Sequence, residues 1–352
     1  LAVAALLFVL SRVESAWSLY AVYAGMGVAM ACTLYEPAFA VLTHAFRSNP
    51  RRAITLVTLF GGLAGTLFWP LTQALIGWLG WRDTLLVLAA LNLLVCAPLH
   101  ARALPDLGAD DPPGPAAAPR ADREAAHGGV SAGPPEAAHA LADAGAASTD
   151  EQDLRAIRAD PMFRALRLTF IGHALLFSSL LVHLMSALQH KGLDASQAAL
   201  IGAMIGPMQI AGRLLELTWG RRLPILRVGQ VAICLLPGAL LLLWAIPAGA
   251  PFWTIALFAL PFGLGNGLLT IVRGSAVTEL WGRRYYGRIS GTIAMPVLAA
   301  NALGPLAAAW LLRLSGSYDG VLVALLAVGL TAAAVFIAAV RARSRSTRAG
   351  ER

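Results

Sequence analysis

Two charged residues, Glu36 and Arg273, lie inside long apolar stretches of this sequence. A charged side chain at the centre of a membrane-spanning helix costs about 2.5–3.5 kcal/mol on insertion scales, so such residues are candidates for function. A carboxylate can take up and release a proton, and a guanidinium can hold an anion. We expect Glu36 and Arg273 either to pair in one conformation and separate in another, as a gate, or to form a permanent structural ion pair.

Two histidines, His173 and His183, lie ten residues apart in another apolar stretch. Ten residues of helix correspond to about 1000° of rotation, which leaves the rings about 80° apart and able to flank one cavity. Histidine titrates near neutral pH and can relay protons, although a hydrogen bond to a neighbouring helix is the more common role. Tyr35 and Asn266, which lie near the charged pair in sequence, are further candidates for contact with a substrate.

Helices must position these side chains, because apolar segments dominate the sequence. Hydrophobic residues make up 58% of the 352 positions and charged residues 13%, against about 25% charged residues in soluble proteins. Nine segments approach or exceed the roughly 20 residues that a helix needs to cross a bilayer core of about 30 Å. The expected spans are Trp17–Thr43, Ala53–Trp78, Thr84–Leu99, Leu166–Leu188, Ser196–Trp219, Val228–Ile246, Phe252–Leu280, Ile289–Leu312 and Val321–Val340.

The basic residues predict how these spans are oriented. Of the 27 lysines and arginines, 22 lie on one side of the expected membrane, in alternate loops and the C-terminal tail. Four lie on the other side: Arg12, Arg82, Lys191 and Arg313. Cytoplasmic loops retain Lys and Arg, so we expect the tail and the long central segment in the cytoplasm and the spans in a bacterial inner membrane. Arg213 is counted with the loop arginines, which leaves Arg273 as the arginine within a span.

Other functional classes lack their usual sequence features. The net charge of +8 does not predict nucleic-acid binding, because the arginines lie beside membrane spans. An integral-membrane enzyme needs clustered His, Asp or Glu near an interface, and a channel needs a selectivity filter or a ring of like charges. Both remain remote alternatives. The three cysteines, which are far apart and have no ligand spacing, predict no metal or other cofactor.

The segment from 102 to 160 is rich in Ala, Pro and Gly and has no apolar periodicity. This composition predicts a disordered cytoplasmic linker. We expect residues 1–101 to be the remainder of an N-terminal helix bundle, 161–341 a C-terminal six-helix bundle, and 342–352 a basic cytoplasmic tail. The chain starts at Leu1 within an apolar run too short to cross a bilayer, so about two and a half helices are expected to be missing.

An internal repeat relates the two halves. The stretch GMGVAMACTLYEPAFAVL from Gly25 resembles GLGNGLLTIVRGSAVTEL from Gly263, an offset of 238 residues. A second pair of segments repeats at an offset of 235 residues, so two consecutive spans stay nearly in register. In this alignment Glu36 corresponds to Gly274, the neighbour of Arg273. A repeat of half a protein is typical of transporters with two parallel halves.

The plan of six spans on each side of a cytoplasmic linker, with Gly-rich fourth and tenth helices, resembles the major facilitator superfamily. The resemblance covers nearly all of the chain apart from the linker and tail. It implies an all-α integral membrane fold of two pseudo-symmetric six-helix bundles. It also implies a secondary active transporter that works by alternating access, with Glu36 and Arg273 on helices that line the cavity and close its cytoplasmic end.

A cytoplasmic loop carries a partial match to a motif of this family. The stretch GRLLELTWGRR is similar to its Gly…Asp-Arg-x-Gly-Arg-Arg motif, and its last three residues match: Gly220, Arg221 and Arg222. Leu217 and Thr218 stand where the family has Asp and Arg, so the charge pair usual there lacks its residues. Glu216 and Glu279, at cytoplasmic helix ends, are expected to form interfacial salt bridges with nearby arginines.

The sequence narrows the substrate only by class. It contains no nucleotide-binding loop, so we expect coupling to an ion gradient, with H⁺ as the candidate ion. Arg273, if unpaired, favours an organic anion or carboxylate, and YEPAF at 35–39 is loosely similar to the monocarboxylate and oxalate/formate branch of the superfamily. Efflux of amphipathic compounds or drugs is the alternative. The expected protein is monomeric, contacts a small-molecule substrate and the lipid bilayer, and binds no nucleic acid.

Overall fold

A computed structural model of the chain describes residues 1–33, 35–46, 49–103 and 151–350. Within these ranges it leaves out the side chains of 65, 66, 69, 70, 73, 221 and 347–350. The described residues are almost entirely helical and contain no strand. This confirms the expected all-α fold.

Eight helical segments among the described residues are long and apolar enough to cross a membrane. They are Ala16–Ala45, Ala74–Arg102, Pro161–His190, Ala195–Thr218, Ile225–Ala245, Phe252–Trp281, Tyr286–Ser315 and Tyr318–Ser346. Each contains or nearly contains an expected span. The ninth expected span, Ala53–Trp78, is helical as part of α4 (Pro50–Leu91).

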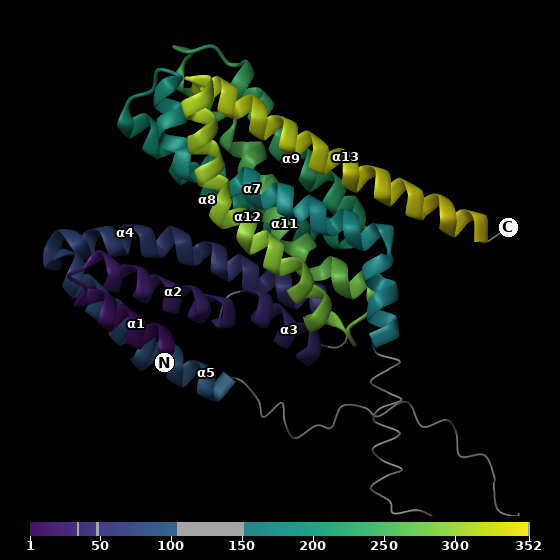
Figure 1. Cartoon of the computed structure of the whole chain (residues 1–352), viewed down its shortest axis with the longest axis horizontal. Coiled ribbons are helices and arrows are strands. Elements are labelled where there is room, and N and C mark those ends of the chain that lie inside the picture. The colour runs from purple at the N-terminus through teal and green to yellow at the C-terminus, as the bar shows by residue number, and fades with distance from the viewer. Residues whose placement is uncertain (34, 47–48, 104–150, 351–352) are drawn as a thin grey trace, which may run out of the picture. The chain divides into compact units, whose positions relative to one another are not determined.

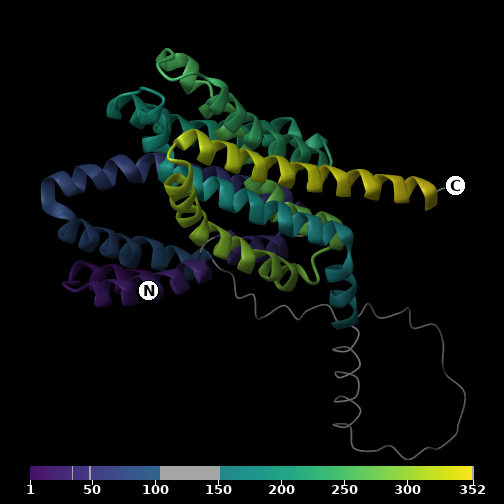
Figure 2. The same ribbon diagram turned by 45° about the horizontal axis from the view of Figure 1, so that its top comes forward.

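Gly80 breaks α4 between two of the expected spans. Its backbone has φ of +78° and ψ of 167°, which is not helical. Glycine adopts positive φ without the steric penalty that a Cβ imposes. This break falls where the sequence predicts a turn, between Trp78 and Thr84. Figure 2 shows that the dark-blue ribbon of α4 reverses direction within its length.

The contacts divide the chain into two units. The first contains Leu1–Met30 and Gln73–Asp153. Its helices are α1 (Ala2–Ser11), most of α2 (Ala16–Thr33), the end of α4, the π-helical turn η1 (Asn92–Cys96) and α5 (Ala97–Ala103). Arg82 donates hydrogen bonds to the carbonyls of Ser11 (3.1 Å) and Val13 (2.8 Å), which fixes the end of α1 against α4.

The second unit, Ala31–Thr72 with Leu154–Arg352, is built around a bundle of long helices (Figure 1). The long helices are α7 (Pro161–His190), α8 (Ala195–Thr218), α9 (Ile225–Ala245), α11 (Ala259–Trp281), α12 (Tyr286–Ser315) and α13 (Tyr318–Gly350). Two short elements lie between them in the chain, η2 (Gly220–Arg222) and α10 (Phe252–Ala256). The helix α11 packs between α8 and α9, and α7 packs against α12 and α13. The helix α3 (Tyr35–Ala45) and the start of α4 join the same unit.

Glycines allow the closest helix approaches in this bundle. A Cβ at Gly267 of α11 would collide with the carbonyl of Gln209 on α8. A Cβ at Gly274 would lie 2.9 Å from Phe39 of α3 and from Ile54 of α4. Small residues at such positions let helix backbones pack closely in a membrane, where apolar side chains gain little from leaving lipid.

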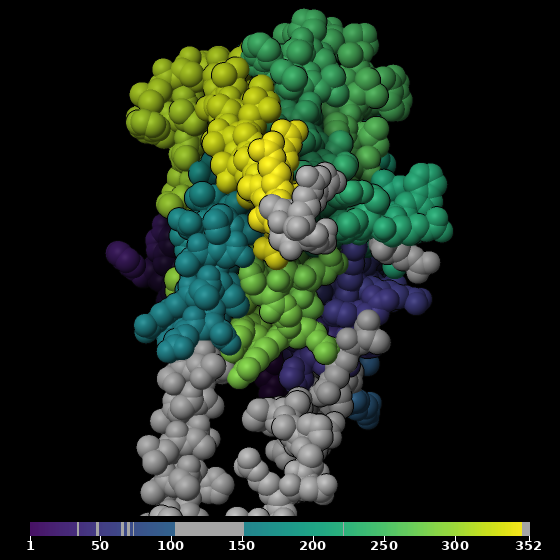
Figure 3. All heavy atoms as spheres, turned by 90° about the vertical axis from the view of Figure 1, so that its right-hand side faces the viewer, coloured from purple at the N-terminus to yellow at the C-terminus, as the bar shows by residue number. Residues whose placement is uncertain are grey.

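Aspartates start two of the helices. Asp160 accepts the amide of Met162 (2.7 Å), and its other oxygen accepts from Trp281 (3.1 Å) and Arg343 (3.4 Å). Figure 3 shows this face, where the first turns of α7 (teal), the start of α12 (light green) and the end of α13 (yellow) lie together. Asp194 caps the N-terminus of α8 with a capping box. Its carboxylate has a lowered pKa, mainly because the hydroxyl of Ser196 donates a hydrogen bond to it and, to a smaller extent, because the amide of Gln197 does.

The structure differs from the expected domain limits at both ends of the linker. Residues 151–159 are helical, and Leu154 is buried in the core of the second unit. Residues 102 and 103 belong to α5, and 104–150 lie outside the described residues. The basic tail also begins as helix, because α13 continues to Gly350 and Arg343 is paired with Asp160.

Large apolar side chains cover the outside of the helices. On α12, Met295, Leu306 and Trp310 are 78%, 67% and 62% exposed. Contiguous apolar surface of this kind is rare on soluble monomers and is what lipid-facing helices present.

Candidate functional site

Glu36 and Arg273 are in contact. Glu36 lies in the first turn of α3, and one of its oxygens accepts a hydrogen bond from Arg273 of α11. Its other oxygen accepts from the hydroxyl of Ser290 on α12 (3.1 Å). Both charged side chains are about one quarter exposed. The carboxylate therefore connects three helices, and α3 comes from the first sequence repeat whereas α11 and α12 come from the second.

The neighbours of this pair hold its backbone in place. Gly274, next to Arg273, packs against the aromatic ring of Phe39, which stacks on Tyr35 with ring centroids 5.3 Å apart. The hydroxyl of Tyr286 donates to the carbonyl of Gly274 (3.0 Å). Tyr35, a candidate for substrate contact from the sequence, therefore belongs to the packed group beside Glu36 and Arg273.

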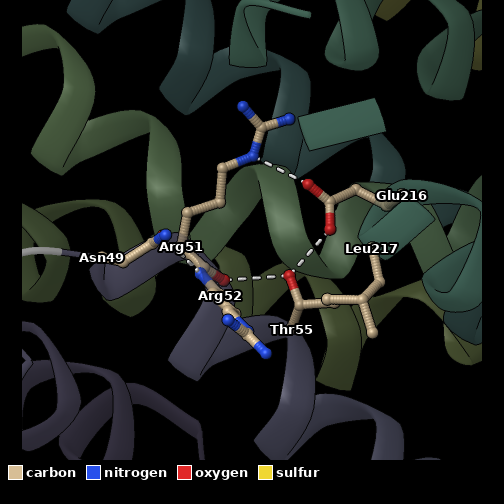
Figure 4. Close-up of a pocket in the computed structure, with 6 residues that line it drawn as sticks. All are labelled: Asn49, Arg51, Arg52, Thr55, Glu216 and Leu217. Atoms are coloured by element: carbon tan, nitrogen blue, oxygen red, sulfur yellow. Dashed lines mark hydrogen bonds and ion pairs between the residues drawn. The ribbon is translucent and has the colours of Figure 1, made fainter. Parts of the chain in front are cut away.

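A second charged cluster, centred on Arg51, lies at the start of α4 (Figure 4). The Nε of Arg51 donates to Glu216 of α8 (2.7 Å), and Nη1 contacts Glu279 of α11 (3.3 Å). Thr55, one turn along α4, donates to the other oxygen of Glu216 (2.8 Å). We call these four residues the Arg51 cluster. They confirm the expected salt bridges of Glu216 and Glu279.

Arg51 also binds the loop that carries the partial family motif. Its Nη2 donates to the carbonyl of Gly220 (2.9 Å) and its Nη1 to that of Leu223 (2.9 Å). Gly220 therefore contributes through its backbone, in the 3₁₀ turn η2. Arg222 is exposed, and the side chain of Arg221 lies outside the described residues.

The Arg51 cluster borders a pocket of about 130 Å³. Glu216 is 1% exposed and the Arg51 side chain 14%. Buried charges of this kind need both a partner and hydrogen bonds to offset their desolvation, and each has them. The pocket is lined by Asn49, Arg51, Arg52, Thr55, Glu216 and Leu217.

The two histidines are placed in different surroundings. His173 hydrogen-bonds to the side-chain oxygen of Asn266 on α11 (3.1 Å) and stacks on Phe177. The structure thus brings two of the expected residues, His173 and Asn266, together. His183 instead contacts the carbonyl of Pro305 on α12 (3.1 Å) and, at 3.5 Å, the hydroxyl of Tyr318 on α13.

The assignment of Arg213 to a loop is wrong. It lies inside α8, one turn before Glu216, and is 3% exposed. Its Nη2 has a long contact of 3.5 Å with Gln209, and its Nε and Nη1 have no hydrogen-bond partner in the described part of the chain. Arg273 is therefore not alone as a membrane-embedded arginine.

Two of the three site residues that the sequence did not single out are indicated weakly by their positions in it. Arg213 stands six residues before the end of its expected span, Ser196–Trp219, which argues against a loop. Arg51 follows Pro50, a residue favoured at a helix start, so its place in the first turn could have been inferred. Ser290 carried no signal, because serine is common in membrane helices. Among the described residues, no group of three or more His, Cys, Asp and Glu could hold a metal ion.

Comparison with known families gives one match. Residues 1–236, two thirds of the chain, match the family model described as Major Facilitator Superfamily. No curated protein matches the chain. The matched region includes α3, α4 and α8, which supply Glu36, Arg51, Arg213 and Glu216.

Proposed function

From the premise that this chain belongs to the major facilitator superfamily and is a multi-pass membrane transporter, we propose a secondary active transporter that moves an organic anion by alternating access. The observation that carries the proposal is the contact between Glu36 and Arg273. It joins a helix of the first repeat to a helix of the second. Two halves that rock against each other must break such a contact in one of their two states.

The Arg51 cluster supports the same mechanism. Arg51 and Thr55 come from the first repeat, and Glu216 and Glu279 from the second. Together with the Glu36–Arg273 pair, these contacts hold α3 and α4 against α8, α11 and α12. An ion pair that forms in only one conformation stabilises that conformation by the free energy of the pair, and so shifts the equilibrium toward it.

Coupling to protons follows from the chemistry of Glu36. When its carboxylate takes up a proton, Arg273 loses its charged partner, and the contact between the repeats weakens. The same release occurs if an anion competes for the guanidinium. We therefore assign Glu36 as the site where H⁺ acts on the gate, with the deprotonated form favouring the paired state.

The test is charge reversal. Glu36→Arg and Arg273→Glu each place like charges together, so each should abolish most transport. The double variant restores opposite charges and should recover part of it. The measurement is gradient-driven, saturable uptake of a labelled organic acid series in proteoliposomes. Arg313→Glu, at an exposed position of α12, serves as the control that keeps activity. A double variant no better than either single variant would count against the gate.

A further inference from the structure

A pocket of about 430 Å³ lies between the start of α9 and the end of α13, two helices that pack against each other (Figure 1). It is lined from α9 by Pro224, Leu226, Arg227 and Gln230, and from α13 by Val340, Arg341, Ser344 and Arg345. Three of these described residues are arginines, and none of them is acidic. The lining is therefore strongly positive.

The helices bring these arginines together on the two faces that border the pocket. Arg341 and Arg345 are four residues apart on α13, about one turn, so they lie on the same face. Arg343, between them, points to another face and pairs with Asp160 (3.4 Å). The arginines of the pocket are therefore distinct from the one that stabilises the bundle.

The three arginines of the pocket have no acidic partner in the described part of the chain. Two carboxylates contact the same helix ends, but both are already engaged. Glu279 accepts from Arg51 (3.3 Å) and from the amide of Ile225 (3.3 Å). Asp160 is paired with Arg343. Like charges that share one pocket repel each other, so an anion bound there is stabilised by all three.

The pocket lies at the depth of the lipid headgroups. The apolar span Tyr318–Ser346 has 29 residues, which is about 43 Å of helix. This length exceeds the bilayer core of about 30 Å and matches the full thickness with headgroups, about 40–45 Å. The arginines at its end therefore extend beyond the core, while Leu226 and Val340 place apolar surface beside them. A phospholipid offers both matching groups, a phosphate and the apolar chains next to it.

We propose that this pocket binds the headgroup of an anionic phospholipid. Arg227, Arg341 and Arg345 hold the phosphate oxygens, because guanidinium groups donate paired hydrogen bonds to phosphate. The amide of Gln230 is a neutral donor for the rest of the headgroup. Basic pockets between helix ends bind such headgroups in other membrane proteins. The bound lipid joins α9 to α13, and the site does not depend on which substrate is transported.

Soluble short-chain lipids test the proposal. The purified full chain in a neutral detergent is titrated with dioctanoyl phosphatidylglycerol, dioctanoyl phosphatidylcholine or inorganic phosphate, and its unfolding temperature is measured. Phosphatidylglycerol should raise this temperature saturably, because it binds the folded state, and the effect should weaken at high salt. Zwitterionic phosphatidylcholine and inorganic phosphate should raise it less. A response to inorganic phosphate as large as that to phosphatidylglycerol would indicate a site for free anions and overturn the lipid assignment. An equal response to phosphatidylcholine would also overturn it.

A double variant locates the binding in the pocket. Arg341→Gln with Arg345→Gln changes two exposed positions, where replacement has little effect on folding. It should weaken the apparent affinity for phosphatidylglycerol about 10- to 30-fold. The matched control, Arg158→Gln with Arg167→Gln, removes two exposed arginines outside the pocket and should respond as the wild type does. An unchanged affinity in the pocket variant, or an equal loss in the control, would contradict the proposal.

Photo-crosslinking of the wild-type protein gives a measurement that needs no variant. A phosphatidylglycerol with a photoreactive group on its headgroup should label peptides from the start of α9 and the end of α13, as identified by mass spectrometry. Unlabelled phosphatidylglycerol should compete with this labelling, and phosphatidylcholine should not. Labelling spread evenly over all helix ends would show contact with bulk lipid and rule out a defined site.

Discussion

Arg51 and Arg213 carry the same charge but have different hydrogen-bond partners. Arg51 donates to two carboxylates and two backbone carbonyls, whereas Arg213 has one long contact with an amide. Satisfied donors stabilise a fold, and unsatisfied buried donors destabilise it. We therefore expect the two arginines to respond in opposite ways to neutral replacement.

Arg51→Gln should lower the free energy of unfolding by about 3 kcal/mol, because it leaves the buried carboxylate of Glu216 without its cation. Its neighbour Arg52 is exposed, and Arg52→Gln should change stability by less than about 0.5 kcal/mol. Thermal unfolding in nanodiscs measures both. The double variant Arg51→Gln with Glu216→Gln should cost less than the two single changes added together. Strict additivity would show that the pair is not coupled.

At the scale of the elements, Lys191 joins the ends of three helices. It follows the last residue of α7, is 4% exposed, and donates to the carbonyls of Trp244 (3.2 Å) and Ile246 (3.0 Å) at the end of α9. It also pairs with Asp319 in the first turn of α13 (3.0 Å). A cation at the end of one helix and an anion at the start of another both suit the helix dipoles. The sequence predicts this lysine only as a residue of the non-cytoplasmic side.

Lys191→Met should lower the free energy of unfolding by about 1–3 kcal/mol, because two carbonyls and a carboxylate lose their donor. Asp319 is half exposed, so Asp319→Asn should cost less, about 1 kcal/mol or below. The comparison uses denaturation of both variants under one detergent condition. Equal losses would mean that the ion pair, rather than the carbonyl contacts, provides the stabilisation.

At the scale of the whole molecule, the arginine distribution predicts how the helices are oriented in the membrane. We expect the C-terminus and the segment 104–150 in the cytoplasm of a bacterial cell. A green fluorescent protein fused after Arg352 should therefore fluoresce, and alkaline phosphatase fused there should be inactive. Phosphatase fused within the loop at 247–251 should be active. The opposite pattern would reverse the orientation and place the Arg51 cluster on the outer face.

The sequence alone determined the class of fold and the segments that form its helices. Each apolar segment moves from water to lipid on its own account, and the basic residues beside it favour one side of the membrane. The spans can therefore be predicted without a structure. The turn at Gly80 and the breaks between the later helices were predicted for the same reason. The expected linker was wrong at 151–159, because Leu154 is buried there by contacts with residues distant in sequence.

Tertiary structure decided which polar groups meet. Sequence pointed to Glu36 and Arg273 because charge inside an apolar segment is costly wherever it lies. Their contact with each other, and the contact of Glu36 with Ser290, depend on how α3, α11 and α12 pack. Arg51 and Arg213 looked alike as members of one basic set. Only the packing of α4 against α8 and α11 gave Arg51 its two carboxylates and left Arg213 facing Gly62 without one. Whether a charge is satisfied depends on neighbours more than 100 residues away in the chain, which no local pattern records.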